Sequence, residues 1–202
     1  MWIKTKNLIL DILFPKFCFS CKREGSYLCD DCQSLLDISG FHRIYQGKNL
    51  DDLYFSVNYK NPLVKKLIQS FKCEPFIKEL TKPLSSLIIS HFQLMDNQPD
   101  FKDFSLIPVP LYKKRLKWRG FNQAEELSKE LSEFFKIPLI TNCLIKETDK
   151  KEFLIKDKEI VKDKNILLVD DFFSTGSTME ECAKVLKEAK AKKVIGIVIA
   201  RE

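Results

Sequence analysis

The sequence predicts an α/β protein in which a mostly parallel sheet is flanked by helices, with a small cysteine-rich region in front of it. Three observations support this prediction: segments of strand and helix length alternate, two Cys-x-x-Cys pairs lie near the N-terminus, and an apolar run ends in two aspartates. Alternating strands and helices favour a parallel sheet, because the helices supply the crossover connections. With 202 residues and 45% hydrophobic content, the chain can form one such domain and a small appendage.

The segment with the most chemical information is the run of residues 166–178. Residues 166–169 are all apolar, which is typical of a central parallel strand covered by helices on both faces. Asp170 and Asp171 follow at the carboxyl end of that strand, where open α/β sheets bind their ligands. Two carboxylates there can accept hydrogen bonds from vicinal hydroxyl groups and can support a hydrated Mg²⁺, so we expect this pair to be the catalytic centre.

A hydroxyl-rich loop follows the aspartates and opens a helix. Gly176 lets the backbone approach a ligand, while hydroxyl and amide groups point toward it. Apolar residues at helical spacing begin at Met179, so the loop lies at a helix N-terminus, which favours phosphate. A diol on the aspartates and a phosphate in the loop together indicate a ribose-phosphate site. The predicted phosphate-binding residues are Ser174, Thr175, Gly176, Ser177 and Thr178.

This pattern resembles the signature of type I phosphoribosyltransferases, in which four apolar residues and two acids precede a Thr-Gly-containing loop. A Walker A loop is excluded, because no Gly-Lys-Ser/Thr occurs. A receiver-like domain is the structural alternative, since its first strand can also end in Val-Asp-Asp. In that domain the acids stand near the start, whereas Asp171 stands near the end of this chain.

Two Cys-x-x-Cys pairs form a second constellation, which comprises Cys18, Cys21, Cys29 and Cys32. Four thiolates at this spacing can close a tetrahedral structural site around Zn²⁺ with no position left for water. Disulfides, iron and redox chemistry are the alternatives. The chain has seven cysteines in all, which favours a reducing compartment over disulfides. The three isolated ones, Cys73, Cys143 and Cys182, are expected to be small core residues.

A basic segment follows the strand that ends near Pro110 and Leu111, with five cations among residues 113–119. Cations beside a strand end could clamp a pyrophosphate, and Arg115 and Arg119 can make bidentate contacts that Lys113 cannot. A solvated basic loop is one alternative, and a nucleic-acid surface on which Trp118 stacks is another. The formal charge of +6 is compatible with polyanionic ligands or nucleic acid and proves neither.

Further elements are predicted around these motifs. The pattern favours strands at 53–59, 106–111, 138–145 and 193–200, and helices at 61–71 and 76–92. The second helix is expected to be interrupted near Pro83, and Asn122 is expected to cap another, with Glu125 as its capping-box partner. His42 and His91 are expected to be surface or capping residues.

Residues 2–14 could be mistaken for a signal peptide, because many of them are apolar. Lys4, Lys6 and Asp11 interrupt the run and no small-residue cleavage site follows, so we expect a short amphipathic helix instead. No apolar run approaches the roughly 18 residues that span a bilayer. A cytoplasmic protein without a membrane span is therefore expected.

The order of these motifs is similar to that of the ComF family of competence-associated, phosphoribosyltransferase-like proteins. The cysteine pairs, Pro108-Val-Pro-Leu111, residues 115–123 and the aspartate motif occur in that order, and Phe71-Lys72 also matches. The resemblance implies a type I phosphoribosyltransferase-like fold over 41–202 and a zinc-ribbon-like region with a helix over 1–40. Members are implicated in processing DNA during natural transformation, or are described as amidophosphoribosyltransferase-like.

The resemblance also implies a ligand and partners. Asp170 and Asp171 would contact the ribose and a metal, residues 175–178 the 5-phosphate, and the segment after Pro110 the pyrophosphate. The implied ligand is phosphoribosyl pyrophosphate with Mg²⁺. Single-stranded DNA and competence or DNA-processing proteins are the candidate macromolecular partners.

Residues 146–164 depart from the family pattern, because they lack its Thr-x-x-Gln element and its Arg/Asn-rich stretch. So short and charge-dense a run indicates a solvated hairpin or mobile loop rather than a pocket wall, which weakens the case for efficient transfer. Three hypotheses follow: a phosphoribosyltransferase, a non-catalytic module that binds phosphoribosyl compounds or nucleic acid, and a zinc-only DNA-binding protein. The third leaves the aspartate signature unexplained.

Overall fold

The computed structural model describes residues 15–42, 44–150 and 152–202. The amphipathic helix expected over 2–14 lies outside these residues. Within the described ranges, no helix has the length and apolar character needed to cross a membrane.

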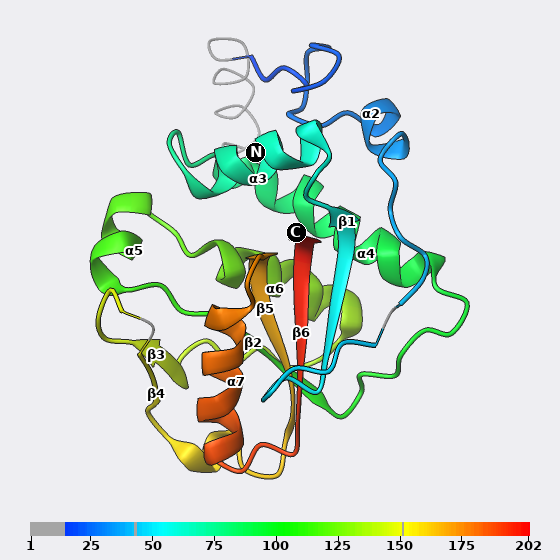
Figure 1. The fold of residues 1–202 in the computed structure, drawn as a ribbon. Coiled ribbons are helices and arrows are strands. Elements are labelled where there is room, and N and C mark those ends of the chain that lie inside the picture. The colour runs from blue at the N-terminus through cyan, green and yellow to red at the C-terminus, as the bar shows by residue number, and fades with distance from the viewer. Residues whose placement is uncertain (1–14, 43, 151) are drawn as a thin grey trace, which may run out of the picture.

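A four-stranded parallel sheet forms the centre of the molecule (Figure 1). Its two inner strands are almost wholly buried, which explains why their sequences are continuous apolar runs. Strands were expected at all four positions. The strand expected over 106–111 begins at Phe104 and ends at Pro108. In spatial order the strands are β1 (Asp52–Asn58), β6 (Lys193–Arg201), β5 (Asn165–Phe173) and β2 (Phe104–Pro108).

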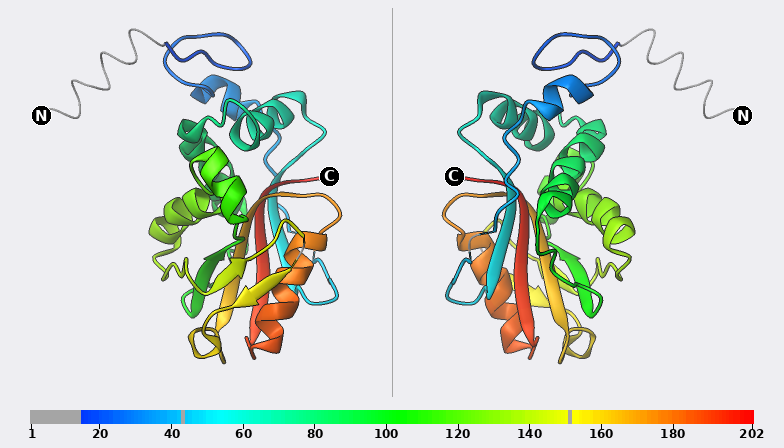
Figure 2. Two further views of the ribbon diagram at one scale, coloured as in Figure 1. Left: turned by 90° about the vertical axis from the view of Figure 1, so that its left-hand side faces the viewer. Right: turned by 90° about the vertical axis from the view of Figure 1, so that its right-hand side faces the viewer.

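Helices cover both faces of the sheet, as the two side views in Figure 2 show. Alternate residues of β5 serve the two cores: Leu167 and Val169 join one cluster, whereas Ile166 and Leu168 join the other. The first cluster lies under α3 (Pro62–Lys72), α4 (Thr81–Leu94) and α6 (Gln123–Phe135), and the second under α7 (Ser177–Glu188).

The expected α6 cap is confirmed, because the Asn122 side chain accepts a hydrogen bond from the Ala124 N–H at 3.2 Å. Glu125 instead pairs with Lys129 at 3.0 Å, so it faces along the helix rather than back to its start. Pro83 does not interrupt a helix; it lies in the first turn of α4, where a missing N–H is tolerated. A short 3-10 turn, η1 (Lys78–Leu80), precedes that helix.

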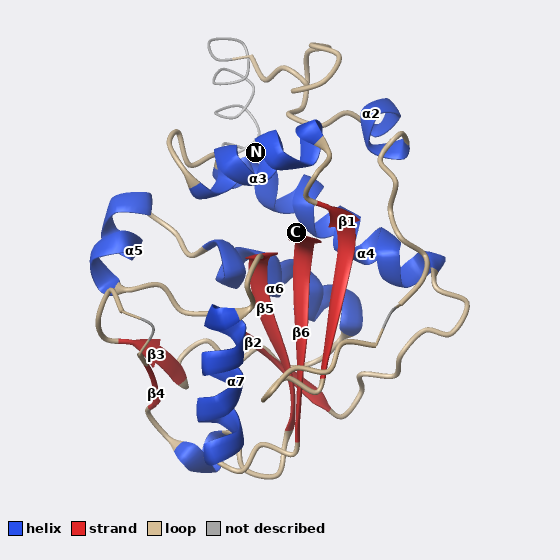
Figure 3. Cartoon of the chain, in the orientation of Figure 1, coloured by secondary structure: helices blue, strands red, loops and turns tan. Residues whose placement is uncertain are grey.

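Three further expectations from the sequence are wrong. The strand expected over 138–145 is only a parallel bridge of Leu139 to Leu106, because the chain then leaves the sheet to form an antiparallel hairpin (Figure 3). The basic segment is a helix rather than a loop, and His91 is buried at 1% exposure with its ring against the Ser39 carbonyl. The elements concerned are α5 (Lys113–Arg119), β3 (Leu144–Lys146), β4 (Phe153–Ile155) and η2 (Lys158–Ile160).

The cysteine-rich segment lies above α3 in Figure 1 and contains one short helix, α2 (Asp30–Ser34). The Lys66 ammonium of α3 lies over the Phe19 ring, 5.1 Å from its centre. A connecting segment then runs to β1, where the His42 ring pairs with Asp52 at 2.9 Å. The cysteine-rich segment is therefore packed against α3, whereas the connecting segment contacts the sheet at β1.

Candidate functional site

Asp170 and Asp171 lie near the carboxyl end of β5, as the apolar run predicted. Both residues line one cavity, which is described below. Asp171 is 3% exposed, and its backbone N–H donates to the Asp170 carboxylate at 2.8 Å. Burial and the neighbouring negative charge of Asp171 raise the pKa of Asp170 to about 7. The pair is thus an electrostatically strained arrangement that a cation or a hydrogen-bonding ligand would stabilise.

The loop after β5 makes a small phosphate-sized cradle at the start of α7. Gly176 caps this helix with φ +74°, and a Cβ added there would lie 2.4 Å from the Phe173 ring. The Thr175 and Ser177 hydroxyl oxygens lie 2.9 Å apart. A cavity of about 30 Å³ is lined by Asp170 and residues 172–179. A helix N-terminus lined with backbone amides and hydroxyl groups favours an anion there.

A second cavity, of about 120 Å³, adjoins the first, because Asp170 and Thr178 line both. Its lining contains two aspartates and four basic side chains, so the formal charge of the lining is positive. Of the predicted residues, Pro110, Leu111, Arg115 and Arg119 line this cavity, whereas Lys113 does not. The four cations are Lys72, Arg115, Arg119 and Lys146.

The basic helix α5 presents its two arginines in different ways. Arg115 pairs with Asp149 of the β3–β4 hairpin at 2.9 Å. Arg119 donates to the Gln123 side chain at 3.1 Å, while its Nε is buried and has no hydrogen-bond partner within the described part of the chain. An orphaned guanidinium donor beside the cavity suits an anionic ligand. Trp118 points elsewhere, 63% exposed and edge-on to Phe76 at 4.9 Å.

The cysteines of the N-terminal segment form a compact cluster. The four sulfur atoms lie within 4.8 Å of one another, and Cys18 and Cys32 are buried. This set of four thiols could hold a metal ion, and its chemistry fits Zn²⁺. Arg23 pairs with Asp31 beside the cluster. Cys143 and Cys182 are core residues as expected, but Cys73 is exposed because it caps the end of α3.

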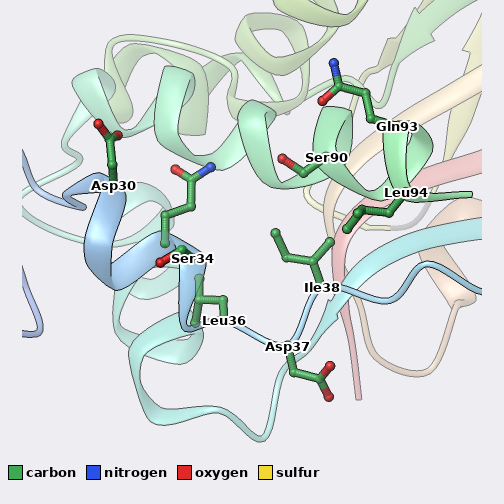
Figure 4. Close-up of a pocket in the computed structure, with 9 residues that line it drawn as sticks. Asp30, Ser34, Leu36, Asp37, Ile38, Ser90, Gln93 and Leu94 are labelled. Carbon is green, nitrogen blue, oxygen red and sulfur yellow. The ribbon is translucent and has the colours of Figure 1, made fainter.

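A larger cavity, of about 490 Å³, lies between α2, the segment after it and α4 (Figure 4). Among the described residues, the charged ones in its lining are Asp30 and Asp37. Negative charge without a cation opposes binding of a phosphorylated ligand, so this cavity does not compete for that role.

Comparison with known proteins identifies the family. A phosphoribosyl transferase domain model matches residues 114–202. The competence protein ComFC of Bacillus subtilis (strain 168) is 30% identical over 206 aligned residues, which cover 92% of this chain and 84% of that protein. This chain belongs to the ComF family. Competence protein F of Haemophilus influenzae is 29% identical, and the alignment covers 90% of this ComF chain and 82% of that protein.

Among solved structures, a phosphoribosylpyrophosphate synthetase from Mycobacterium smegmatis aligns with a TM-score of 0.39 and 19% identity. The alignment covers 60% of the ComF chain and 33% of that chain, and this likeness is too low to bear on function. The phosphoribosyltransferase-like domain therefore rests on the family-model match and on the parallel sheet with its strand-end motif.

Several residues that line this cavity of the ComF protein were not predicted as site residues, among them Lys72, Gln123 and Lys146. Lys72, at the end of α3, pairs with Asp171 at 3.0 Å. Gln123 is 2% exposed and donates to the Phe71 carbonyl at 2.8 Å. Lys146 belongs to the charge-dense segment 146–164, where nothing distinguishes it from its neighbours. The Phe71-Lys72 motif drew attention to Lys72 in the sequence, but the sequence alone could not place Lys72 in the pocket.

The segment 146–164 is partly different from expectation. Its β3–β4 hairpin was anticipated, yet Phe153 and Val161 are buried and Lys146 reaches the cavity. Burial and the charge of Arg115 lower the pKa of Lys146. The hairpin of this ComF protein therefore forms part of the pocket wall rather than a wholly solvated loop.

Proposed function

We propose that this ComF-family protein binds phosphoribosyl pyrophosphate together with Mg²⁺. The supporting observation is the pair of adjoining cavities, in which two carboxylates stand between a hydroxyl-lined helix N-terminus and a wall of four cations. The 5-phosphate would occupy the loop of residues 174–178, and the ribose hydroxyls would bind Asp170 and Asp171. The pyrophosphate would face Arg115, Arg119 and Lys146.

The residues present fit a divalent cation, because the two carboxylates stand next to the position proposed for the pyrophosphate. Asp170 is the carboxylate that a metal would stabilise most, since its pKa of about 7 reflects unfavourable burial of charge. Bound Mg²⁺ would neutralise charge on the pyrophosphate. The protein's own cations would hold that group in place.

If transfer takes place, the aspartates would stabilise positive charge that develops on the ribose while α5 receives the departing pyrophosphate. The acceptor is not indicated, because neither His42 nor His91 lines the cavity. A non-catalytic phosphoribosyl- or nucleic-acid-binding module is the second candidate. It is favoured by the cavity lining, which retains the phosphoribosyl-binding residues but, among the described residues, offers no histidine as a base for an acceptor.

We further propose that the protein acts in DNA uptake during natural transformation, as the names of its relatives suggest. In this proposal residues 1–40 form a zinc-bearing region and residues 41–202 a cytoplasmic phosphoribosyltransferase-like domain. Single-stranded DNA and DNA-processing proteins would be partners. Binding of DNA that weakens with salt and survives Asp170→Asn with Asp171→Asn would indicate a separate basic surface.

Titration calorimetry with phosphoribosyl pyrophosphate and Mg²⁺ tests the ligand. The parent protein should bind, and the Asp170→Asn, Asp171→Asn double variant should not. A pyrophosphate-release assay on the same samples separates transfer from binding alone. Absence of binding by a folded parent protein would overturn the proposal.

A further inference from the structure

The basic helix α5 has two faces, and the candidate pocket uses only one of them. Arg115 and Arg119, four residues apart, lie on the face that lines the cavity of about 120 Å³. No residue of the helix is buried in the core, and the helix lies at the edge of the molecule (Figure 1). Helical spacing directs four exposed residues away from the arginines. This outer face of α5 comprises Lys113, Lys114, Lys117 and Trp118.

The lysines of the outer face carry charge that no neighbouring side chain balances. Within residues 15–42, 44–150 and 152–202, none of their three ammonium groups makes an ion pair or a hydrogen bond. Arg115, by contrast, is paired with Asp149 on the other side of the helix. The helix itself contains no acidic residue. Like charges one turn apart repel one another, so a bound polyanion would stabilise this face.

Trp118 adds a flat aromatic surface to these charges. The Phe76 ring, in the loop after α3, meets the indole at an interplanar angle of 79° with the ring centres 4.9 Å apart. This contact orients the indole, yet Trp118 remains 63% exposed, so core packing does not account for it. An exposed aromatic ring beside unpaired cations suits a single nucleic-acid strand, because the ring can stack on a base while the cations hold the phosphates.

We propose that the outer face of α5 binds single-stranded nucleic acid, with Trp118 stacked on a base and the three lysines against the backbone phosphates. Because the arginines of the same helix line the cavity, the bound strand passes beside the phosphoribosyl site without filling it. A duplex fits less well, since its bases already stack on one another and do not reach the indole. This inference rests on the part of the proposed function that names single-stranded DNA as a partner, and it adds the surface.

Fluorescence anisotropy with a labelled oligothymidylate of about 16 nucleotides, at fixed salt, tests the stacking contact. Trp118→Ala should weaken binding by about tenfold, the range for one lost base–aromatic stack, whereas Trp118→Phe should lose less than about threefold. Binding should also quench the tryptophan fluorescence of the parent protein, and most of this quenching should disappear in Trp118→Phe. An unchanged affinity in Trp118→Ala, or equal affinity for a duplex of the same length, would overturn the inference.

The salt dependence of binding tests the lysines. In Lys114→Met with Lys117→Met, the slope of log affinity against log salt should fall in magnitude by about 1.4, the change for two lost phosphate contacts on a single strand. Lys192→Met with Lys193→Met is the matched control. It removes the same charge from two exposed lysines at the amino end of β6, whereas α5 follows the carboxyl end of β2. Equal changes in slope would overturn the inference, because net charge alone would then explain binding.

The Asp170→Asn, Asp171→Asn double variant should bind the oligonucleotide at least as tightly as the parent protein, because the aspartates lie outside the outer face. Loss of binding in that variant would overturn the inference by placing the strand in the pocket. Equal binding of a polyaspartate peptide of the same charge would also overturn it, since the face would then bind any polyanion. A parent protein that binds no oligonucleotide would overturn both this inference and the proposed DNA partner. Binding of phosphoribosyl pyrophosphate, measured separately, would still stand.

Discussion

The two halves of the candidate pocket are built in different ways. The phosphate half, residues 170–178, is one continuous strand, loop and helix start. The cation half brings Lys72 from α3, the arginines from α5 and Lys146 from β3, and Lys72 lies 99 residues from the aspartate it contacts. Local backbone geometry forms the first half, whereas packing of distant elements forms the second. A substitution in the phosphate half should therefore disrupt that half as a whole. A substitution in the cation half should remove one contact to the ligand and leave the others in place.

The largest effect is expected from Gly176→Ala in the phosphate half. The residue has φ +74°, and its new Cβ would force the Phe173 ring to move, so we expect loss of phosphoribosyl pyrophosphate binding. The free energy of unfolding should fall by about 3 kcal/mol or more, from backbone strain and the ring displacement together. Urea unfolding and calorimetry measure the two effects.

Gly120→Ala is the control for backbone strain alone. Gly120 has φ +81°, but an added Cβ there would meet nothing within 4 Å. The loss of stability should be about 1–2 kcal/mol, with binding largely retained. Equal losses for the two variants would show that the contact with Phe173 does not shape the loop.

A graded effect is expected from Arg119→Met in the cation half. Its orphaned guanidinium donor is assigned to the pyrophosphate, so affinity for phosphoribosyl pyrophosphate should fall by about thirtyfold, the range for a charge-assisted hydrogen bond. Affinity for ribose 5-phosphate, which lacks the pyrophosphate, should hardly change. Lys113→Met, outside the cavity lining, should affect neither ligand. Equal losses for both ligands would contradict the division of the pocket.

The pH dependence of stability should reveal the strain at Asp170. The folded pKa is raised from 3.8 to about 7, so the protonated form is favoured in the folded state and its contribution is complete below pH 3.8. That contribution is lost as the pH rises through about 7. Asp170→Asn should therefore gain stability over the parent protein from pH 5 to about pH 8, in urea unfolding without ligand or Mg²⁺. A stability difference that does not vary with pH would show that Asp170 titrates normally.

The smallest effect on the pocket is expected from Cys32→Ser in the N-terminal cluster. The variant should lose bound zinc, because one of four thiols within 4.8 Å of each other is removed. Affinity for phosphoribosyl pyrophosphate should change by less than about threefold, since the cluster supplies no residue to the cavity lining. Elemental analysis and calorimetry check the two parts. A large loss of affinity would mean that α3 depends on the metal-bearing segment above it.

The sequence by itself determined the sheet, the phosphate half and the cysteine cluster, because each follows from short-range rules. Continuous apolar runs place β5 and β6 in the interior, and an acidic pair at a strand end identifies the ligand-binding edge. Two Cys-x-x-Cys pairs bring their own sulfur atoms together. Asn122 likewise caps α6 through bonds within a few residues.

Only the tertiary structure decided the cation half of the pocket, the departure of the chain from the sheet where a strand was predicted over 138–145, and the burial of single residues. Nothing in the charge-dense run 146–164 distinguishes Lys146, which reaches the cavity because the β3–β4 hairpin packs beside α7. His91 is buried and Cys73 exposed because of where α4 and α3 lie, not because of their neighbours in sequence. Lys72 meets Asp171 for the same reason: the contact depends on how a helix and a strand 99 residues apart are packed, and a local pattern carries no record of that packing.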